Sequence, residues 1–114
     1  MSQPESDRYF VQADSTLARA LFPGITIRAT AGDAVMLSLA TFEPGADLPE
    51  HAHPHEQMGM MISGQLEFTV GGQTRILETG DIWRIPGSVP HKARSLDGPA
   101  VALDVFHPVR EDYR

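Results

Sequence analysis

Apolar and polar residues alternate in short runs from Leu17 to the end of the chain, and turn residues separate these runs. No stretch keeps the 3.6-residue period of a helix for three turns. Because side chains on a strand point alternately to opposite faces, the pattern predicts an all-β domain. The predicted strands are 25–30, 35–42, 57–63, 65–70, 73–77, 81–85, 91–95 and 101–106.

Eight short strands at this spacing indicate a sandwich, a jelly roll or a small barrel. Gly71 and Gly72 stand where a two-residue hairpin needs positive φ, which glycine reaches without steric cost. The polar residues 1–15 predict a flexible N-terminal arm, and residues 16–114 a single domain. No repeat or linker divides that domain.

Composition narrows the possible partners. The chain has 114 residues, of which 41% are hydrophobic and 21% charged, with a formal net charge of -6. This charge argues against nucleic acid and anionic membranes as partners, so an anionic ligand would need a local positive site. The absence of cysteine excludes disulfides and thiolate metal sites. Without an apolar signal segment at the start, we expect a soluble, cytoplasmic protein.

Three of the five histidines lie in the segment "PEHAHPHEQM", residues 49–58. If the segment enters a strand, then His51, His53, His55 and Gln57 share one face and Glu56 points to the other. Imidazoles two residues apart on a strand can converge on one metal ion. Histidines in a proline-rich loop can equally be solvated, and the segment alone does not decide between these readings.

A second histidine motif resembles a known pattern when it is combined with the first. Residues Gly45 to Gly64 read G-x5-H-x-H-x3-Q-x6-G, and residues Gly80 to His91 read G-x5-P-x4-H. The two motifs together resemble those of the cupin superfamily, over residues 35–106. The resemblance implies a double-stranded β-helix, that is, a jelly-roll barrel or sandwich, with a metal ion in its mouth.

The resemblance also implies the metal ligands, namely His51, His53, His91 and, at the position usually held by glutamate, Gln57. The cofactor would be one divalent transition metal ion per chain, nickel, zinc, manganese or iron. Two residues depart from the family pattern, because glutamine replaces glutamate and Ser88 stands where glycine is usual. A neutral amide leaves the charge of the ion uncompensated, so the site should favour anions and hold its metal weakly.

Two other side chains compete for a place among the ligands. His55 shares parity with the predicted set, although Pro54 can break the alternation. Glu56 would need a local bulge to reach the ion. Both are kept as second-rank candidates.

The last predicted strand carries one carboxylate. Alternation through "VALDVF" puts Asp104 on one face with Ala102 and Phe106. Asp104 would be costly to bury unless it is hydrogen bonded or put to use, and a low-dielectric pocket would raise its pKa into the range useful for proton transfer. On an edge strand the same residue would simply face water.

The ending "LDVFHPVREDY" narrows the resemblance to the small single-domain cupins of the KdgF type, which are pectin degradation proteins. This resemblance implies an enzyme that converts 4,5-unsaturated monouronates from pectin or alginate to linear ketonised forms, a lyase or isomerase. It implies Asp104 as the catalytic acid or base, Arg110 as the binder of the substrate carboxylate and Phe106 as an apolar wall. Arg110 can instead form a surface salt bridge with Glu111 or Asp112.

Two other functions stay open, a metal-dependent dioxygenase and a non-catalytic sugar-binding or regulatory cupin. We also expect a homodimer, because a small open sandwich exposes sheet edges. Met58 and Met60 are expected in the core, and Met61 in the core or beside the ligands. Trp83 and Ile85 should share one strand face, with Trp83 either in the core or as a sugar-stacking platform.

Overall fold

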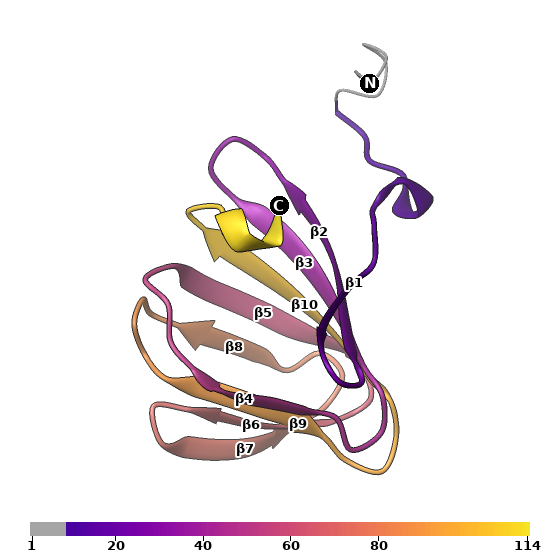
Figure 1. The fold of residues 1–114 in the computed structure, drawn as a ribbon. Helices are drawn as coiled ribbons and strands as arrows, with labels where there is room; N and C mark the ends of the chain where they lie inside the picture. Colours follow the sequence, from indigo (N-terminus) through magenta and orange to yellow (C-terminus); the bar gives the residue numbers. More distant parts are fainter. Residues whose placement is uncertain (1–8) are drawn as a thin grey trace.

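The computed structural model describes residues 9–114. The first eight residues of the predicted arm lie outside the described part of the chain. The remaining arm residues are mostly exposed and include one 3₁₀ turn, Ala13–Ser15. In Figure 1 this segment runs beside the β-sheets rather than between them.

In the described residues, ten strands form two antiparallel sheets that face each other (Figure 1). The larger sheet has the order β1-β2-β3-β10-β5-β8 and the smaller one the order β4-β9-β6-β7. The strands are β1 Arg19–Phe22, β2 Ile25–Ala31, β3 Met36–Phe42, β4 Asp47–His51, β5 Glu56–Ser63, β6 Leu66–Val70, β7 Gln73–Leu77, β8 Ile82–Ile85, β9 His91–Ser95 and β10 Ala100–His107. This architecture confirms the predicted all-β jelly roll.

The eight predicted strands are present, with ends that agree within one residue. Two further strands, β1 and β4, are not among the predictions. The sequence of β4, "DLPEH", contains a proline and shows no alternation of apolar residues. Its strand conformation depends on pairing with β9, in which Asp47 faces Arg94 and Leu48 faces Ala93. Proline is tolerated there because β4 is an edge strand.

The apolar core lies between the two sheets. Alternation is clearest on β3, where Met36, Ser38, Ala40 and Phe42 are buried and the residues between them are exposed. On β10 the same parity turns Ala102 and Phe106 inward, as predicted. The buried residues from the facing strands include Ile25, Ile27, Met61, Leu66, Phe68, Trp83, Ile85 and Ala93. The two sheets thus enclose one main core, which ends in a pocket on the side of the histidines.

Two of the three methionine predictions are wrong. Met58 and Met60 are 43% and 39% exposed on the outer face of the larger sheet, whereas Met61 is fully buried. The inward parity of β5 is that of Gln57 and Met61, so the methionines one residue away point to the outside. The prediction for Trp83 and Ile85 holds, because both lie on the inner face.

No helix in residues 9–114 is long and apolar enough to cross a membrane. The homodimer and the cytoplasmic location stay predictions.

Candidate metal centre

Three histidines from separate parts of the fold meet at the mouth of the two sheets. His51 ends β4, His53 lies in the loop before β5, and His91 begins β9. The β4–β9 pairing sets His51 directly opposite His91. The possible ligand atoms of the three lie within 4.8 Å of one another. The structure therefore places these three histidines to bind a metal ion.

Backbone carbonyls hold one nitrogen of each imidazole. The Nδ1 atoms of His51, His53 and His91 lie 2.9, 3.1 and 2.8 Å from the carbonyl oxygens of Pro49, His55 and Val89. Each Nδ1 therefore carries the imidazole proton and donates a hydrogen bond to a carbonyl, which leaves Nε2 with a free lone pair. This second contact also fixes the ring orientation, as is usual for metal-binding histidines.

The Nε2 atoms have the environment that a cation would satisfy. Nε2 of His91 is buried and has no hydrogen-bond partner. Nε2 of His53 lies 3.0 Å from Oε1 of Gln57, although its Nδ1 already faces a carbonyl oxygen. A neutral imidazole has only one N–H, so one of these two oxygens faces a lone pair rather than a donor. The lone pairs of His53 Nε2 and Gln57 Oε1 then point at each other, an arrangement that a metal ion bound by both atoms would stabilise.

Gln57 points its oxygen toward the histidines because its nitrogen is held elsewhere. Nε2 of Gln57 donates a hydrogen bond of 2.7 Å to Oδ1 of Asp104. An ionised carboxylate only accepts, which fixes which end of the amide faces it. Gln57 is itself 6% exposed. The amide oxygen is therefore directed to the histidine cluster, as the predicted ligand role requires.

Burial keeps the imidazoles of His53 and His91 neutral. Burial, with smaller contributions from the neighbouring His51 and His53, lowers the pKa of His91 to about 4. The pKa of His53 is also lowered, first by burial and then by the positive charge of Arg110. Neutral imidazole is the form that binds metal ions, so the lowered pKa values keep the cluster competent for binding at neutral pH.

The loop before β9 positions His53 through its backbone. The N–H of Ser88 donates a hydrogen bond of 2.7 Å to the carbonyl of His53. Ser88 has φ of 68°, a left-handed conformation that suits glycine. Next to it, a Cβ on Gly87 would lie 2.4 Å from the carbonyl oxygen of Pro54. The close approach explains the glycine at position 87, and the left-handed backbone at Ser88 explains the glycine that the family pattern has there.

The second-rank candidates lie outside the cluster. Among the described residues the three-histidine group includes neither His55 nor Glu56. Glu56 is exposed on β5, opposite His107 of β10. The prediction that residues 51–57 follow one strand is wrong, because residues 52–55 form a loop between β4 and β5. The ring of His55 lies beside that of His53, with centroids 5.4 Å apart, but His55 is not part of the three-histidine group.

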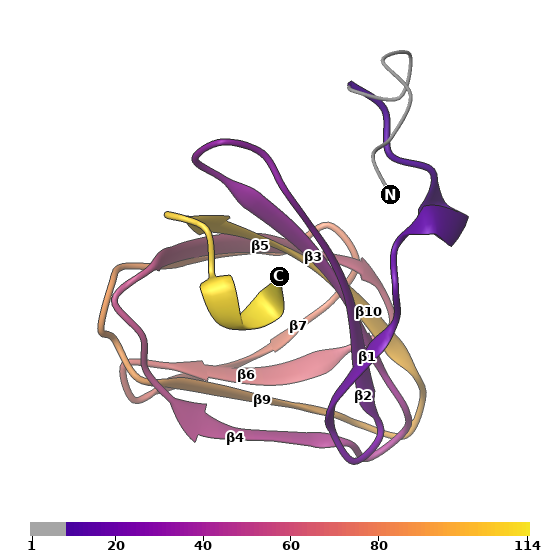
Figure 2. The same cartoon turned by 45° about the horizontal axis from the view of Figure 1, so that its top comes forward.

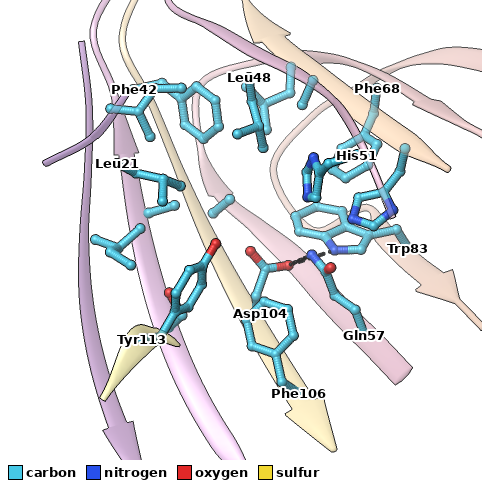
Figure 3. A pocket seen from close by; sticks show the side chains of 18 of the residues that line it. Leu21, Phe42, Leu48, His51, Gln57, Phe68, Trp83, Asp104, Phe106 and Tyr113 are labelled. Carbon is cyan, nitrogen blue, oxygen red and sulfur yellow. Dashed lines mark hydrogen bonds between the residues drawn. The ribbon is translucent and has the colours of Figure 1, made fainter. Parts of the chain in front are cut away.

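Asp104 lies on the inner face of β10, between Ser38 of β3 and Gly59 of β5. Its Oδ1 accepts hydrogen bonds from Nε2 of Gln57 at 2.7 Å and from Nε1 of Trp83 at 2.8 Å (Figure 3). Burial raises the pKa of Asp104 to about 6, although both hydrogen bonds oppose this rise. The carboxyl therefore changes protonation close to neutral pH.

Gly59 makes room for the indole that holds Asp104. A Cβ on Gly59 would lie 2.3 Å from the ring of Trp83, so only glycine lets the indole cross β5 here. The other side of Trp83 packs against Phe68, with ring centroids 4.9 Å apart. The tryptophan is thus fixed as a hydrogen-bond donor, a role that the sequence prediction did not give it.

Phe106 and Arg110 complete the predicted set. Phe106 is buried and meets the ring of His53 edge-on, with centroids 5.7 Å apart. The guanidinium of Arg110 stacks on Phe106 and Tyr113, at 5.2 and 4.0 Å from their centroids. It also forms an ion pair of 2.8 Å with Asp112, while its side chain is only 11% exposed. Arg110 therefore makes the predicted salt bridge and lines the pocket as well.

One pocket brings the two groups of residues together. Its walls include the two histidines His51 and His91, the residues Gln57 and Asp104, and the C-terminal residues Phe106, Arg110 and Tyr113. The rest of its lining is largely apolar and includes Leu21, Ile25, Ile27, Phe42, Leu48 and Leu66. Three of the four predicted ligands, His51, Gln57 and His91, thus share one cavity with the predicted catalytic set.

Sequence reasoning missed Trp83 as a partner of Asp104, and it missed Tyr113 entirely. A buried tryptophan usually finds an acceptor for its N–H, and Asp104 was the carboxylate that the family resemblance placed at the site. That combination was a usable signal. Tyr113 gives no such signal, because the tail after β10 shows no periodicity that would return it to the pocket.

Comparisons with known proteins find a matching family model, relatives by sequence and similar structures. Residues 38–106 match the family model described as the Cupin domain. Over 108 residues the chain is 33% identical to the pectin degradation protein KdgF of Dickeya dadantii (strain 3937), which covers 93% of this chain and 97% of that protein. The structure of KdgF from Halomonas sp. has a TM-score of 0.85 and 28% identity, covering 92% of this chain and 97% of that one.

An RmlC-like cupin from Shewanella frigidimarina NCIMB 400 has a TM-score of 0.87 and 26% identity, covering 94% of this chain and 96% of that one. The matched segment 38–106 contains the four predicted metal ligands and two of the three other predicted site residues. Arg110 lies just beyond it.

Proposed function

The chain belongs to the cupin family, and from that premise we propose that it is a metal-dependent enzyme of unsaturated uronate metabolism. It converts a 4,5-unsaturated monouronate, released from pectin or alginate, to the linear ketonised form. The relative at 33% identity is named a pectin degradation protein, which supports the pectin source. The protein needs no external oxidant or reductant, because the conversion only moves protons and electron pairs within the sugar.

The observation that carries the proposal is the connection between the histidine cluster and a titratable carboxyl. Gln57 contacts His53 at 3.0 Å through its oxygen and Asp104 at 2.7 Å through its nitrogen. A proton-transferring group and a metal-binding cluster therefore lie on the two sides of one amide. Structural carboxylates seldom keep a pKa raised to about 6, whereas acid–base groups at active sites do.

The proposed reaction has two proton transfers. The anomeric hydroxyl loses its proton, the bond between C1 and the ring oxygen breaks, and C1 becomes an aldehyde. The electron pair stays on the ring oxygen, which becomes the oxygen of an enolate whose double bond joins C4 and C5. Protonation at C4 then gives the 5-keto sugar, and the conjugated double bond is lost.

Asp104 is suited to carry these protons. Its Oδ1 is occupied by the two hydrogen bonds from Gln57 and Trp83, which leaves Oδ2 for the substrate. With a pKa of about 6, Oδ2 accepts a proton at neutral pH and is acidic enough to give it back. The same hydrogen bonds fix the carboxyl plane, so no reorientation is needed between the two transfers.

The remaining groups bind and orient an anionic sugar. A divalent ion, when bound by His51, His53, His91 and Gln57, supplies Lewis-acid stabilisation of negative charge on a sugar oxygen. Arg110 offers a planar fork for the uronate carboxylate and would exchange its ion pair with Asp112 for it. Phe106 provides an apolar wall between Arg110 and His53.

The test uses the loss of conjugation. The metal-loaded protein should accelerate the decay of the ultraviolet absorbance of an unsaturated monouronate, without oxygen uptake. Asp104→Asn should lower the rate by about 100-fold or more while metal content stays at the wild-type level. Asp33→Asn, an exposed carboxylate in the β2–β3 turn, is the matched control.

Each other outcome would reject the proposal in a distinct way. Oxygen consumption with this substrate would identify a dioxygenase. Sugar binding without any change in the absorbance decay would identify a non-catalytic cupin. An Asp104→Asn variant as fast as the wild type would remove Asp104 from the chemistry.

A further inference from the structure

The pocket is nearly closed by the C-terminal end of the chain. The cavity has a volume of about 30 Å³, which accommodates roughly two waters. A six-carbon uronate is much larger than two water molecules and does not fit in this space. Figure 2 shows the 3₁₀ turn Glu111–Tyr113 at the open end of the two sheets. Part of the wall therefore has to move before a sugar can enter.

Tyr113 is the part of this turn that faces the pocket. Its ring meets Phe106 edge-on, with centroids 5.6 Å apart and planes at 89°. The guanidinium of Arg110 covers the ring at 4.0 Å from its centroid. Tyr113 also packs against both buried apolar clusters of the domain. These contacts seat the ring in one position when the turn is closed.

The hydroxyl of Tyr113 is directed into the cavity. In Figure 3 it points to the side of Asp104 that lies away from His51. Burial raises the pKa of the Tyr113 hydroxyl, so it stays a neutral phenol that can donate a hydrogen bond. A sugar held between the histidines and the C-terminal turn would present its hydroxyl groups to this donor.

The turn itself is held by exposed contacts. Arg19 of β1 donates hydrogen bonds of 2.7 and 3.2 Å to the carbonyl oxygens of Arg114 and Asp112. Both contacts are exposed, so water competes for the same groups. Beyond His107 no strand pairing holds the segment. Apart from the ring of Tyr113, the turn is held at the mouth of the site by such exposed contacts, so it can open without disturbing the sheets.

From these observations we propose that Tyr113 is a substrate-positioning residue. The C-terminal turn opens to admit the sugar and closes to bring the Tyr113 hydroxyl into hydrogen bonding with it. The substrate contact rests on the proposed function, whereas closure of the pocket by the turn does not.

Closure can be measured without any substrate, because Trp83 is the single tryptophan and lines the pocket. Trp83 is 5% exposed, so acrylamide should quench its fluorescence poorly in the wild type. Tyr113→Ala and Arg19→Gln should each raise the quenching constant about twofold or more. Arg28→Gln, which removes a similar exposed bond to Thr16, should leave it unchanged.

The substrate contact is measured with Tyr113→Phe, which keeps the ring and removes the hydroxyl. Its quenching constant should equal that of the wild type, and its KM for the unsaturated monouronate should rise about 3- to 10-fold, as expected for one lost hydrogen bond. The matched control is Tyr9→Phe, because Tyr9 is the other tyrosine and is 78% exposed.

The possible failures are distinguishable. A wild-type protein that does not convert the sugar would overturn the proposed function and with it the substrate contact, while the quenching data still decide closure. An active wild type with unchanged KM and kcat in Tyr113→Phe would overturn the contact alone. Unchanged quenching in folded Tyr113→Ala would overturn closure.

Discussion

Replacing Asp104 with asparagine should make the metal-free protein more stable at neutral pH. The buried carboxyl accepts hydrogen bonds from Gln57 and Trp83, and an asparagine oxygen can accept both in the same place. The substitution removes the charge while keeping the shape. Metal-free protein is specified because metal binding would couple the stability to protonation of the histidines.

The magnitude follows from the pKa of Asp104, which is 3.8 for the unperturbed carboxyl and about 6 in the fold. Each pKa unit is worth about 1.4 kcal/mol, so the ionised carboxyl costs the fold about 3 kcal/mol. The native state binds the proton more tightly, so wild-type stability falls as pH rises from about 4 to 6. Asparagine has no such loss. The stability gap should therefore be small near pH 4 and complete above pH 7.

His91 acts in the opposite direction and is shared by both proteins. Its pKa falls from 6.5 to about 4 in the fold, so stability is lost as pH drops through this range. The two effects largely offset each other in the wild type, and the variant should show the histidine effect alone. The difference between the two proteins isolates the carboxyl.

The assay is urea unfolding followed by circular dichroism at pH 4, 5, 6, 7 and 8, in the presence of a chelator. Asp33→Asn, which changes an exposed carboxylate, should parallel the wild type at every pH. A gap between Asp104→Asn and the wild type that stays constant from pH 4 to pH 8 would refute the reasoning. It would mean that the carboxyl is hydrated in the native state.

Three further changes test single features of the structure. Ser88→Gly should raise the Tm by a few degrees, because the left-handed backbone costs a serine roughly 1–2 kcal/mol and glycine less; a lower Tm would mean that the serine side chain makes a stabilising contact. Gly59→Ala should cost about 1–3 kcal/mol and alter the tryptophan emission, because its Cβ would meet the indole, while Gly98→Ala has open space and should do neither. Added Zn²⁺ or Ni²⁺ should raise the wild-type Tm, because a metal concentration a hundredfold above Kd stabilises the folded protein by about 2.7 kcal/mol. His53→Ala should abolish that rise in Tm, whereas His55→Ala should keep it. If only His55→Ala abolished the rise, His55 rather than His53 would be the metal ligand.

The sequence was most informative where the signal is local. Alternation is visible within a single strand, so the shared face of Asp104 and Phe106 on β10 could be read directly. The paired glycines 71 and 72 predicted the hairpin between β6 and β7, and both have positive φ in the structure. The resemblance to the cupin motifs supplied the three histidines, which the structure then brought together.

Predictions failed where strand conformation or orientation depends on distant residues. The segment of β4 has no alternation of its own, and it becomes a strand because β9 pairs with it. Met58 and Met60 were predicted in the core because their side chains are apolar. On β5, however, Gln57 points to the inner face, so these two methionines point to the outer one. Hydrophobic residues on an outer sheet face are indistinguishable in sequence from those on an inner one.

The sequence by itself thus determined the fold class, the histidine motifs and the shared strand face of Asp104, Ala102 and Phe106, because each depends on spacing along one segment. Only the tertiary structure decided that Gln57 joins the histidines to Asp104, that Trp83 holds the same carboxyl and that Tyr113 returns to the pocket. The hydrogen bonds of Asp104 join residues 47 and 21 positions apart, which strand register brings together. Tyr113 reaches the pocket from a tail that shows no periodicity. Register and chain return are set by packing the whole domain, and no local pattern encodes them.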